Sequence, residues 1–528
     1  MSELKSTLDF TEEKDFNTSE EHKALDAIRS FKGNYPRQLW YLFFSEMWER
    51  FSFYGMRGML TFFMINQLFM DEKVANLQYG ATQAFVYAFT FIGGMFADKI
   101  LGFRKSLFWG GILMITGSLI LAINPQEFFF LGISFNIIGT GFFKPNISTM
   151  VGLLYKDGDS RRDAGFSLFY SGINIGALLG GYACIAIGKG TMLGSVIPEN
   201  LHWNVAFGLV AVVMTISLLT FVRTRHSLGP IGLSPVNLRA QKGGLELSRR
   251  WPEYLVYVGA LVCIPLIIVM VSTPRYVDLF MNIIGPASLL YLGYEMTKHN
   301  KQENLKLLAA LCFILFSVIF WAIYEQAGGS LSIFADNNLN NDFLGGLIQL
   351  DANGVNNAAN ALFVIIMAPL VGLLWVSMSK RKIEPNTVVK FGISFLFLGG
   401  AYFIYYSLRF FADDNGISSL DMFTLAYFVV TLGELCLSPI GLSIMTKLSP
   451  TRLQGVMMGM WFLASAYGQY AAGLFGASIV ADSPDATNTD KLISYTSGYY
   501  DFAIYAIIAG VVLLAISPLV RKLMGNVK

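Results

Sequence analysis

The amino-acid sequence predicts an all-α polytopic membrane protein, because its composition is strongly apolar and its apolar stretches have helical length. Of 528 residues, 54% are hydrophobic and only 14% are charged, whereas soluble proteins contain about 25% charged residues. Stretches long enough to cross a hydrocarbon core of about 30 Å recur along the chain, separated by short polar links. The net charge is +2 and the basic residues are scattered, so no nucleic-acid partner is expected.

Each apolar stretch is expected to form one transmembrane helix in the lipid bilayer. The first begins directly after Asn34-Tyr35-Pro36-Arg37, and the others follow at short intervals. The fourteen predicted spans lie near residues 38–69, 79–101, 105–124, 127–155, 160–189, 202–224, 252–273, 277–297, 303–334, 353–379, 387–409, 419–447, 453–480 and 500–523. An even number of spans places both chain ends on the same side of the membrane.

The distribution of Lys and Arg over the links predicts the orientation. Alternate links are basic, as at Lys380-Arg381-Lys382, and the links between them are acidic or neutral, as at Asp413-Asp414. Basic links stay in the cytoplasm, so both termini are expected there, in a plasma (inner) membrane. The first residues lack the apolar core of a signal peptide, so the first span is expected to serve as the targeting signal.

The chain is expected to contain two helix bundles of similar size. A cytosolic tail (residues 1–37) precedes the first six-helix bundle (38–224). A cytoplasmic loop (225–251) and an inserted two-helix hairpin (252–297) then lead to the second six-helix bundle (303–523). The tail is expected to hold at most a short helix near residues 20–31. The hairpin differs from the other spans because its interior carries few polar residues.

No metal, haem or other cofactor is expected, and the chain is not expected to be an enzyme. The cysteines lie singly in separate apolar stretches, and the histidines lie in the tail, at span ends or in links, so neither has the spacing of a ligand set. An integral membrane enzyme or a respiratory subunit is therefore disfavoured. The residues concerned are Cys184, Cys263, Cys312, Cys436, His22, His202, His226 and His299.

The first span contains four ionisable residues, Glu46, Glu49, Arg50 and Arg57. Each costs at least about 2.5–3.5 kcal/mol at bilayer depth unless it is paired or faces water. At about 100° per residue, these residues and Tyr54 share one face of the helix. This stripe predicts a polar pathway inside a helix bundle.

Two further polar residues lie deep in predicted spans. Lys144 is far from either end of the fourth span, so its ammonium cannot snorkel to the surface and needs a carboxylate partner or a water-filled cavity. The carboxylates of the first span are the expected partners, and a purely structural ion pair is the alternative. Asn174 lies among glycines, which predict close helix packing. Its amide can equally contact a ligand or a neighbouring helix.

A glycine turn with charged residues closes the second span, at residues 93–105. Asp98 is expected to bond the N-terminus of a neighbouring helix. Arg104 and Lys105 are expected to hold the cytoplasmic surface. This arrangement resembles a signature of the major facilitator superfamily.

Several longer motifs resemble those of one branch of that superfamily, the proton-dependent oligopeptide transporter family. The matching motifs are Glu-x-x-Glu-Arg-Phe-x-(aromatic)-Tyr-Gly at 46–55, Lys-Pro-Asn at 144–146, Phe-Tyr-x-x-Ile-Asn-x-Gly at 169–176, Phe-Trp-x-x-Tyr-Glu-Gln-x-Gly at 320–328 and Gly-Glu-Leu-x-Leu-Ser-Pro at 433–439. The resemblance implies a major facilitator fold with two six-helix bundles and the inserted hairpin. It also matches the general pattern of transporters that bind substrate near the midplane.

The resemblance further implies uptake of di- and tripeptides together with protons by alternating access, with the proton gradient as the energy source. The protein is expected to work as a monomer. Proton coupling is assigned in this way to Glu46, Glu49, Arg50, Lys144 and Glu325. Substrate binding is assigned to Tyr54, Arg57, Tyr87, Lys144, Asn174, Trp321, Asn357, Asn360, Glu434 and Ser438.

Within this set, a peptide zwitterion needs a cationic and an anionic pole. Arg57 and Lys144 are expected to attract the peptide carboxylate. Glu434 is expected to take the ammonium group, with Asn174 and with Asn357 or Asn360.

Three positions depart from the family pattern. Phe53 replaces a usual Tyr, Ala361 replaces a frequent Pro, and Tyr79-Gly80 stands where some members have a titratable His. The last departure favours Glu46, Glu49 and Glu325 as proton carriers. A related facilitator for drugs or small anions is the alternative function, although it has no reason to keep both Lys144 and Glu434.

Overall fold

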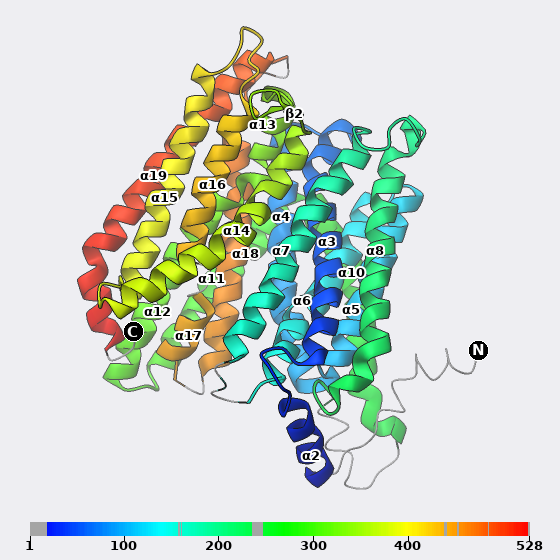
Figure 1. Cartoon of the computed structure of the whole chain (residues 1–528), viewed down its shortest axis with the longest axis vertical. Coiled ribbons are helices and arrows are strands. Elements are labelled where there is room, and N and C mark those ends of the chain that lie inside the picture. The colour runs from blue at the N-terminus through cyan, green and yellow to red at the C-terminus, as the bar shows by residue number, and fades with distance from the viewer. Residues whose placement is uncertain are drawn as a thin grey trace. The chain divides into compact units, whose positions relative to one another are not determined.

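The computed structural model describes residues 18–156, 159, 161–234, 246–437, 441–450, 453–483 and 485–525. These residues are almost entirely helical (Figure 1), and the predicted all-α fold class is confirmed. The helices are α2 (Thr18–Arg29), α3 (Arg37–Asn66), α4 (Glu72–Phe96), α5 (Phe103–Ile123), α6 (Phe129–Leu153), α7 (Arg161–Gly188), α8 (His202–Thr224), α10 (Glu246–Ser272), α11 (Pro274–Met296), α12 (Lys301–Tyr324), α13 (Ser330–Asn338), α14 (Ala352–Lys380), α15 (Thr387–Ser407), α16 (Leu420–Leu437), α17 (Gly441–Leu448), α18 (Gln454–Ser478) and α19 (Asn488–Met524). A short hairpin, β1 (Asp342–Phe343) with β2 (Ile348–Gln349), precedes α14.

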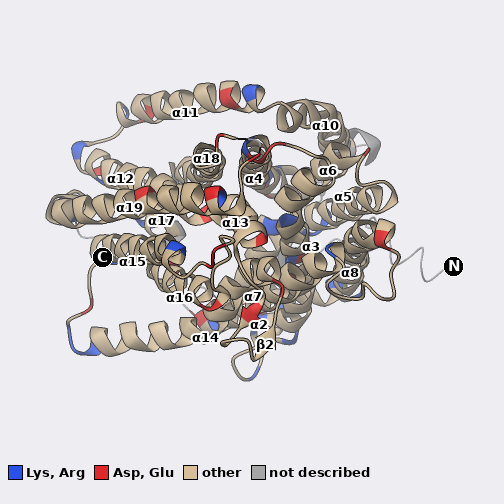
Figure 2. Ribbon diagram, turned by 90° about the horizontal axis from the view of Figure 1, so that it is seen from above, with Lys and Arg blue, Asp and Glu red and all other residues tan. Residues whose placement is uncertain are grey.

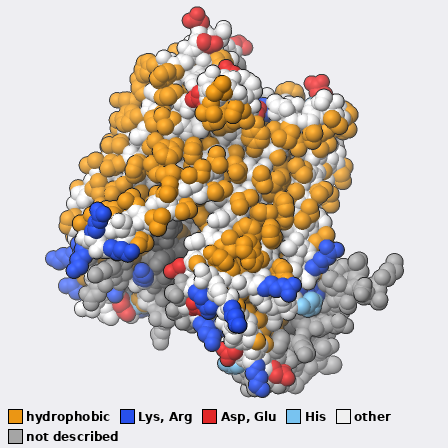
Figure 3. All heavy atoms as spheres, in the orientation of Figure 1, with side chains coloured by type: hydrophobic (Ala, Val, Ile, Leu, Met, Phe, Trp, Pro, Cys, Tyr) orange, Lys and Arg blue, Asp and Glu red, His pale blue; other side chains and the backbone are white. Residues whose placement is uncertain are grey.

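The described helices account for the predicted membrane spans. Eleven helical segments are long and apolar enough to cross a membrane. Helices α3, α6 and α18, with 30, 25 and 25 residues, occupy the three other predicted spans. Charged residues are sparse along the helices (Figure 2). On the face that Figure 3 shows, hydrophobic side chains cover much of the surface, and most Lys and Arg side chains lie below them in that view.

The chain divides into two compact units. Unit 1 comprises Met1–Arg57 with Phe85–Ser272, and unit 2 comprises Gly58–Ala84 with Thr273–Lys528. Helices α3 and α4 therefore contribute their residues to both units. The connection between the two spans of the predicted hairpin lies at Thr273, between α10 and α11, and coincides with the division.

Unit 1 packs α5 against α6 and α8, and α7 against α8. Helix α7 also approaches α3 closely, because a Cβ atom on Gly176 would lie 2.1 Å from the carbonyl oxygen of Met47. The same holds for Gly180 and the carbonyl oxygen of Phe51, also at 2.1 Å. Only glycine fits at both positions, which confirms the close packing that the glycines of this span predict.

The tail helix α2 belongs to unit 1 and lies close to the predicted residues 20–31. Its Leu25 and Ile28 pack against the hydrophobic core of the unit. The Arg29 guanidinium donates hydrogen bonds to the carbonyl oxygen of Leu153 at the end of α6, at 3.0 and 3.2 Å. The tail helix thus covers one end of the unit.

The glycine turn after α4 differs from its prediction. Arg104 and Lys105 are buried and do not lie at the surface. The Arg104 Nε donates to the carbonyl oxygen of Ile231 at 2.7 Å, and the Lys105 ammonium lies 2.9 Å from the Glu253 carboxylate of α10. Asp98 is exposed and bonds no helix N-terminus among the described residues. The basic residues therefore bind protein groups, because α10 and the segment after α8 cover them.

Unit 2 packs α15 against α16 and α19, and α12 against α18 and α19. The start of α4 belongs to this unit and crosses α18 closely, because a Cβ atom on Gly80 would lie 2.7 Å from the Cα atom of Gly473. Buried tyrosines fill the interior, with the ring of Tyr499 5.8 Å from those of Tyr402 and Tyr405. Small residues at the crossing and large rings in the core fix the positions of these helices.

In unit 2, the observed helices differ from two of the predicted spans. The stretch 303–334 was predicted as one helix, but α12 ends at Tyr324, a 3-10 turn spans Glu325–Gly328, and α13 follows. The two glycines at 328 and 329 explain the break, since glycine weakens a helix interior. Helix α19 begins at Asn488, twelve residues before the predicted start near 500, because Thr487 and Asp490 form a capping box.

Candidate functional site

The polar stripe of α3 is buried in unit 1. Glu46, Glu49 and Arg50, here named the carboxylate cluster, are exposed by 1%, 0% and 2%. The Arg50 Nε lies 3.0 Å from a Glu46 oxygen and 2.5 Å from a Glu49 oxygen. The helical spacing causes this arrangement, because a residue four positions before Arg50 lies directly above it on the helix.

Several buried polar atoms of the carboxylate cluster lack a hydrogen-bond partner among the described residues. Two carboxylates share one guanidinium, and the Oε2 of Glu46, both carboxylate oxygens of Glu49 and the Nη2 of Arg50 make no aligned hydrogen bond with the described residues. Buried charges are costly unless they are paired and hydrogen-bonded. A proton on one of the two carboxylates would remove the excess negative charge.

Lys144 does not form the expected ion pair with the carboxylates in this structure. Its ammonium lies 4.5 Å from the ring centre of Tyr87 and 5.6 Å from that of Phe53, and no carboxylate of a described residue lies within ion-pair distance of it. Arg50, from the same helix as Glu46 and Glu49, occupies the pairing position instead. Phe53 at the variant family position therefore offers a cation–π contact.

Tyr54 and Arg57 lie one and two turns beyond Arg50 and are partly exposed. The Arg57 guanidinium lies 5.9 Å from the ring centre of Tyr54. Asn174 is buried, and its amide donates to the carbonyl oxygen of Tyr170 in its own helix at 2.9 Å. The structure thus places the predicted cationic residues of unit 1 near aromatic rings.

In unit 2, Glu434 is held by residues far away in sequence. Its Oε2 accepts a hydrogen bond from the Tyr324 hydroxyl at 2.6 Å and another from the Asn360 amide at 2.8 Å. The same amide also donates to the Thr431 hydroxyl at 3.1 Å. Tyr324, Asn360, Thr431 and Glu434, here named the Glu434 cluster, bring together α12, α14 and α16.

Two other predicted residues of unit 2, Trp321 and Glu325, lie at the break after α12. Trp321 packs edge-to-face on Tyr324, with ring centres 5.2 Å apart. Glu325 begins the 3-10 turn and is buried. The Asn357 amide donates to the carbonyl oxygen of Asn353 at 2.9 Å. Ser438 lies outside the described residues.

Sequence reasoning missed two members of the Glu434 cluster. Tyr324 stands inside a family motif, but the motif alone assigns it no role. Thr431 lies three residues before Glu434, so both side chains lie on one face of α16. That spacing was the available signal for Thr431, whereas the contact of Tyr324 required the packed structure.

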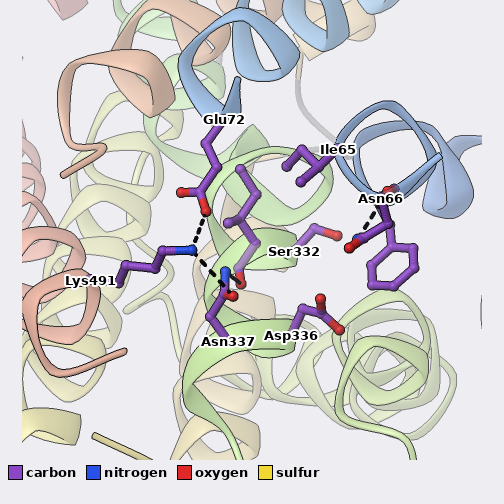
Figure 4. A pocket seen from close by; sticks show the side chains of 9 residues that line it. Ile65, Asn66, Glu72, Ser332, Asp336, Asn337 and Lys491 are labelled. Atoms are coloured by element: carbon purple, nitrogen blue, oxygen red, sulfur yellow. Dashed lines mark hydrogen bonds and ion pairs between the residues drawn. The ribbon is translucent and has the colours of Figure 1, made fainter. Parts of the chain in front are cut away.

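A separate pocket of about 150 Å³ lies in unit 2. Figure 4 shows the Lys491 ammonium pointing toward Glu72 and Asn337. The Glu72 carboxylate lies 2.7 Å from this ammonium and also accepts a bond from the Tyr495 hydroxyl at 2.7 Å. The lining residues are Phe62, Ile65, Asn66, Glu72, Ser332, Ile333, Asp336, Asn337 and Lys491. No predicted substrate residue lines it, and its ion pair joins the starts of α4 and α19.

Buried, incompletely paired charges inside membrane-spanning helices define a transporter class of membrane protein, since such groups mark ion and substrate pathways. Comparison with known proteins identifies the class more closely. The model of the POT family matches residues 104–237 and 272–492. The chain therefore belongs to the POT family.

Relatives along the whole chain agree with this assignment. The chain is 34% identical over 525 residues to the peptide transporter YePEPT of Yersinia enterocolitica, covering 94% of this chain and 97% of that protein. It is 31% identical over 512 residues to the di-/tripeptide transporter of Lactococcus lactis subsp. cremoris, covering 93% and 97%. It is also 33% identical over 511 residues to the uncharacterized transporter YclF of Bacillus subtilis, covering 93% and 96%.

Solved structures show the same fold. A crystal structure of the peptide transporter POT with sulfate superposes with a TM-score of 0.79 at 31% identity, covering 96% of this chain and 99% of that one. A POT family transporter with 5-aminolevulinic acid gives a TM-score of 0.77 at 28% identity, covering 94% and 99%. The predicted major facilitator fold is thereby confirmed.

Proposed function

We propose that this transporter is a symporter that imports di- and tripeptides together with protons. The carboxylate cluster is the observation that carries the proposal. Two buried carboxylates share one guanidinium at 3.0 and 2.5 Å. The three groups together carry one excess negative charge, which a bound proton would neutralise. Relatives named as peptide and di-/tripeptide transporters support the substrate class.

The proposed substrate groups follow the charges of the two units. Arg57 and Lys144 attract the peptide carboxylate, and Glu434 takes the ammonium group. Residues Tyr54, Tyr87, Asn174, Trp321, Asn357, Asn360 and Ser438 complete the proposed substrate-binding set. The cationic residues and Glu434 lie in membrane-spanning helices, where a charge without a partner is costly. A substrate that carries both a carboxylate and an ammonium group is therefore favoured over an uncharged one.

The proposed coupling is alternating access. A proton on Glu46 or Glu49 neutralises the cluster, and binding of peptide and proton together favours reorientation. Arg50, Lys144 and Glu325 are proposed to take part in this coupling. The proton gradient is proposed to be the driving force, without a cofactor.

The membrane placement is also part of the proposal. Basic residues at the ends of α14 and α19, such as Lys380 and Arg521, support cytoplasmic termini by the positive-inside rule. The protein is proposed to reside in the inner membrane and to function as a monomer.

Uptake into proteoliposomes with an imposed inward proton gradient tests the function. A panel of dipeptides, tripeptides, free amino acids and non-peptide anions is offered, and accumulation is measured with and without an ionophore. Accumulation of peptides that the ionophore abolishes is expected. Transport of an anion with no uptake of any peptide would overturn the proposal and favour the alternative facilitator.

A further inference from the structure

The two oxygens of Glu434 differ in their environment. Its Oε2 accepts bonds from the Tyr324 hydroxyl at 2.6 Å and from the Asn360 amide at 2.8 Å. No described residue donates a hydrogen bond to Oε1, and the side chain is only partly buried. An ionised carboxylate can accept about four hydrogen bonds. The protein therefore occupies one oxygen and leaves the other able to accept from a ligand.

The Tyr324 hydroxyl is fixed in place by its neighbours in α12. The phenol ring stacks on Phe320 with ring centres 5.6 Å apart and an interplanar angle of 19°. Trp321 contacts the same ring edge-to-face at 5.2 Å and 89°. Because two aromatic side chains hold the ring, the hydroxyl is positioned before any ligand binds.

The Asn360 amide is fixed in a similar way. Its nitrogen donates to the Thr431 hydroxyl at 3.1 Å and to Glu434 at 2.8 Å, while Thr431 donates to the carbonyl oxygen of Tyr427 at 2.8 Å. Two donor contacts assign the nitrogen side of the amide. Its oxygen receives no bond from a described residue and is a second acceptor beside Glu434.

We propose that Tyr324 and Thr431 are positioning residues that orient Glu434 and Asn360 as a pair of acceptors for the primary ammonium group of a peptide. This inference rests on the proposed function and adds two residues to it. The Tyr324 hydroxyl holds one carboxylate oxygen, and Thr431 holds the amide nitrogen. An N-acetylated peptide lacks the charged donors that the two open oxygens accept, so the cluster selects for a free N-terminus.

Selection between free and blocked peptides tests the inference. Dialanine and N-acetyl-dialanine compete with a labelled dipeptide for uptake into proteoliposomes. The IC50 of the blocked peptide divided by that of the free peptide, here named the blocked-to-free ratio, measures the selection. Tyr324→Phe is expected to lower this ratio about tenfold, because a hydrogen bond to a charged group is lost while the ring remains. Thr431→Val, which keeps the side-chain shape, is expected to lower it less.

Matched variants separate positioning from general structural damage. Tyr402 is another buried tyrosine of unit 2, and its hydroxyl donates to the carbonyl oxygen of Ile323. Thr424 is another threonine of α16 that bonds its own helix, at 2.8 Å to the carbonyl oxygen of Leu420. Tyr402→Phe and Thr424→Val are expected to leave the blocked-to-free ratio unchanged.

A double substitution decides whether Tyr324 acts through Glu434. In a Glu434→Gln background, adding Tyr324→Phe is expected to leave the ratio where Glu434→Gln alone sets it. An equal loss of affinity for both peptides in Tyr324→Phe, or a further fall of the ratio in the double variant, would overturn the inference. Wild-type protein that takes up no peptide would instead refute the proposed function.

Discussion

Glu49→Gln is the most direct test of the carboxylate cluster. The substitution removes one carboxylate and keeps the size of the side chain. Glu46 and Arg50 then remain as a pair at 3.0 Å without excess charge. The variant therefore resembles the protonated cluster at all pH values, and we expect it to lose the coupling of uptake to protons.

The expected size of the effect follows from the gradient. One coupled proton and a pH difference of one unit supply about 1.4 kcal/mol, which is a tenfold accumulation of peptide at equilibrium. Glu49→Gln is expected to lower the accumulation ratio to about one, which is the value for passive equilibration. Exchange of peptide across the membrane needs no net proton movement, so counterflow of peptide is expected to persist.

The assay measures accumulation of labelled dipeptide in proteoliposomes, followed by counterflow in the same vesicles preloaded with unlabelled peptide. Glu127→Gln is the matched control, because Glu127 is exposed in the link before α6 and is expected to accumulate peptide like the wild type. Tenfold accumulation by Glu49→Gln would show that another group carries the proton. Loss of counterflow as well would show that the residue is needed for binding or reorientation.

Three further substitutions test other contacts. Lys144→Ala is expected to lose concentrative uptake, measured in the same vesicles, while Lys144→Arg keeps part of it. Glu253→Gln is expected to destabilise the protein by about 3–5 kcal/mol, because it leaves the buried Lys105 ammonium without its partner. The thermal unfolding temperature checks this, and it should recover in a Lys105→Met, Glu253→Leu double variant. Glu72→Gln is expected to cost about 1–3 kcal/mol by releasing Lys491, and an unfolding temperature equal to that of the wild type would exclude a stabilising role for this ion pair.

Much of the fold could be predicted from local sequence. Apolar length is a property of short segments, and it predicted the spans that the described helices occupy. The errors occurred where a local signal was outweighed or overlooked. Two glycines interrupt the predicted span at 303–334, and the capping residues Thr487 and Asp490 start α19 earlier than its apolar run suggests.

The sequence named the candidate residues of the site, but it predicted few of the contacts between them. Glu46, Glu49 and Arg50 lie within one helical turn, so their spacing along the helix already brings them together. The partner of Lys144 could not be chosen in this way. Its ammonium lies by the ring of Tyr87, which depends on how two helices pack.

The sequence by itself determined that this is a polytopic membrane protein with charged residues on one face of its first span, because hydropathy and helical period act over a few turns. The resemblance of its motifs to a known family then implied a transporter. Only the tertiary structure decided which groups satisfy those charges. Tyr324 reaches Glu434 across 110 residues, and Lys105 reaches Glu253 across 148. Such contacts depend on the packing of whole helices against one another, and no local pattern encodes that packing.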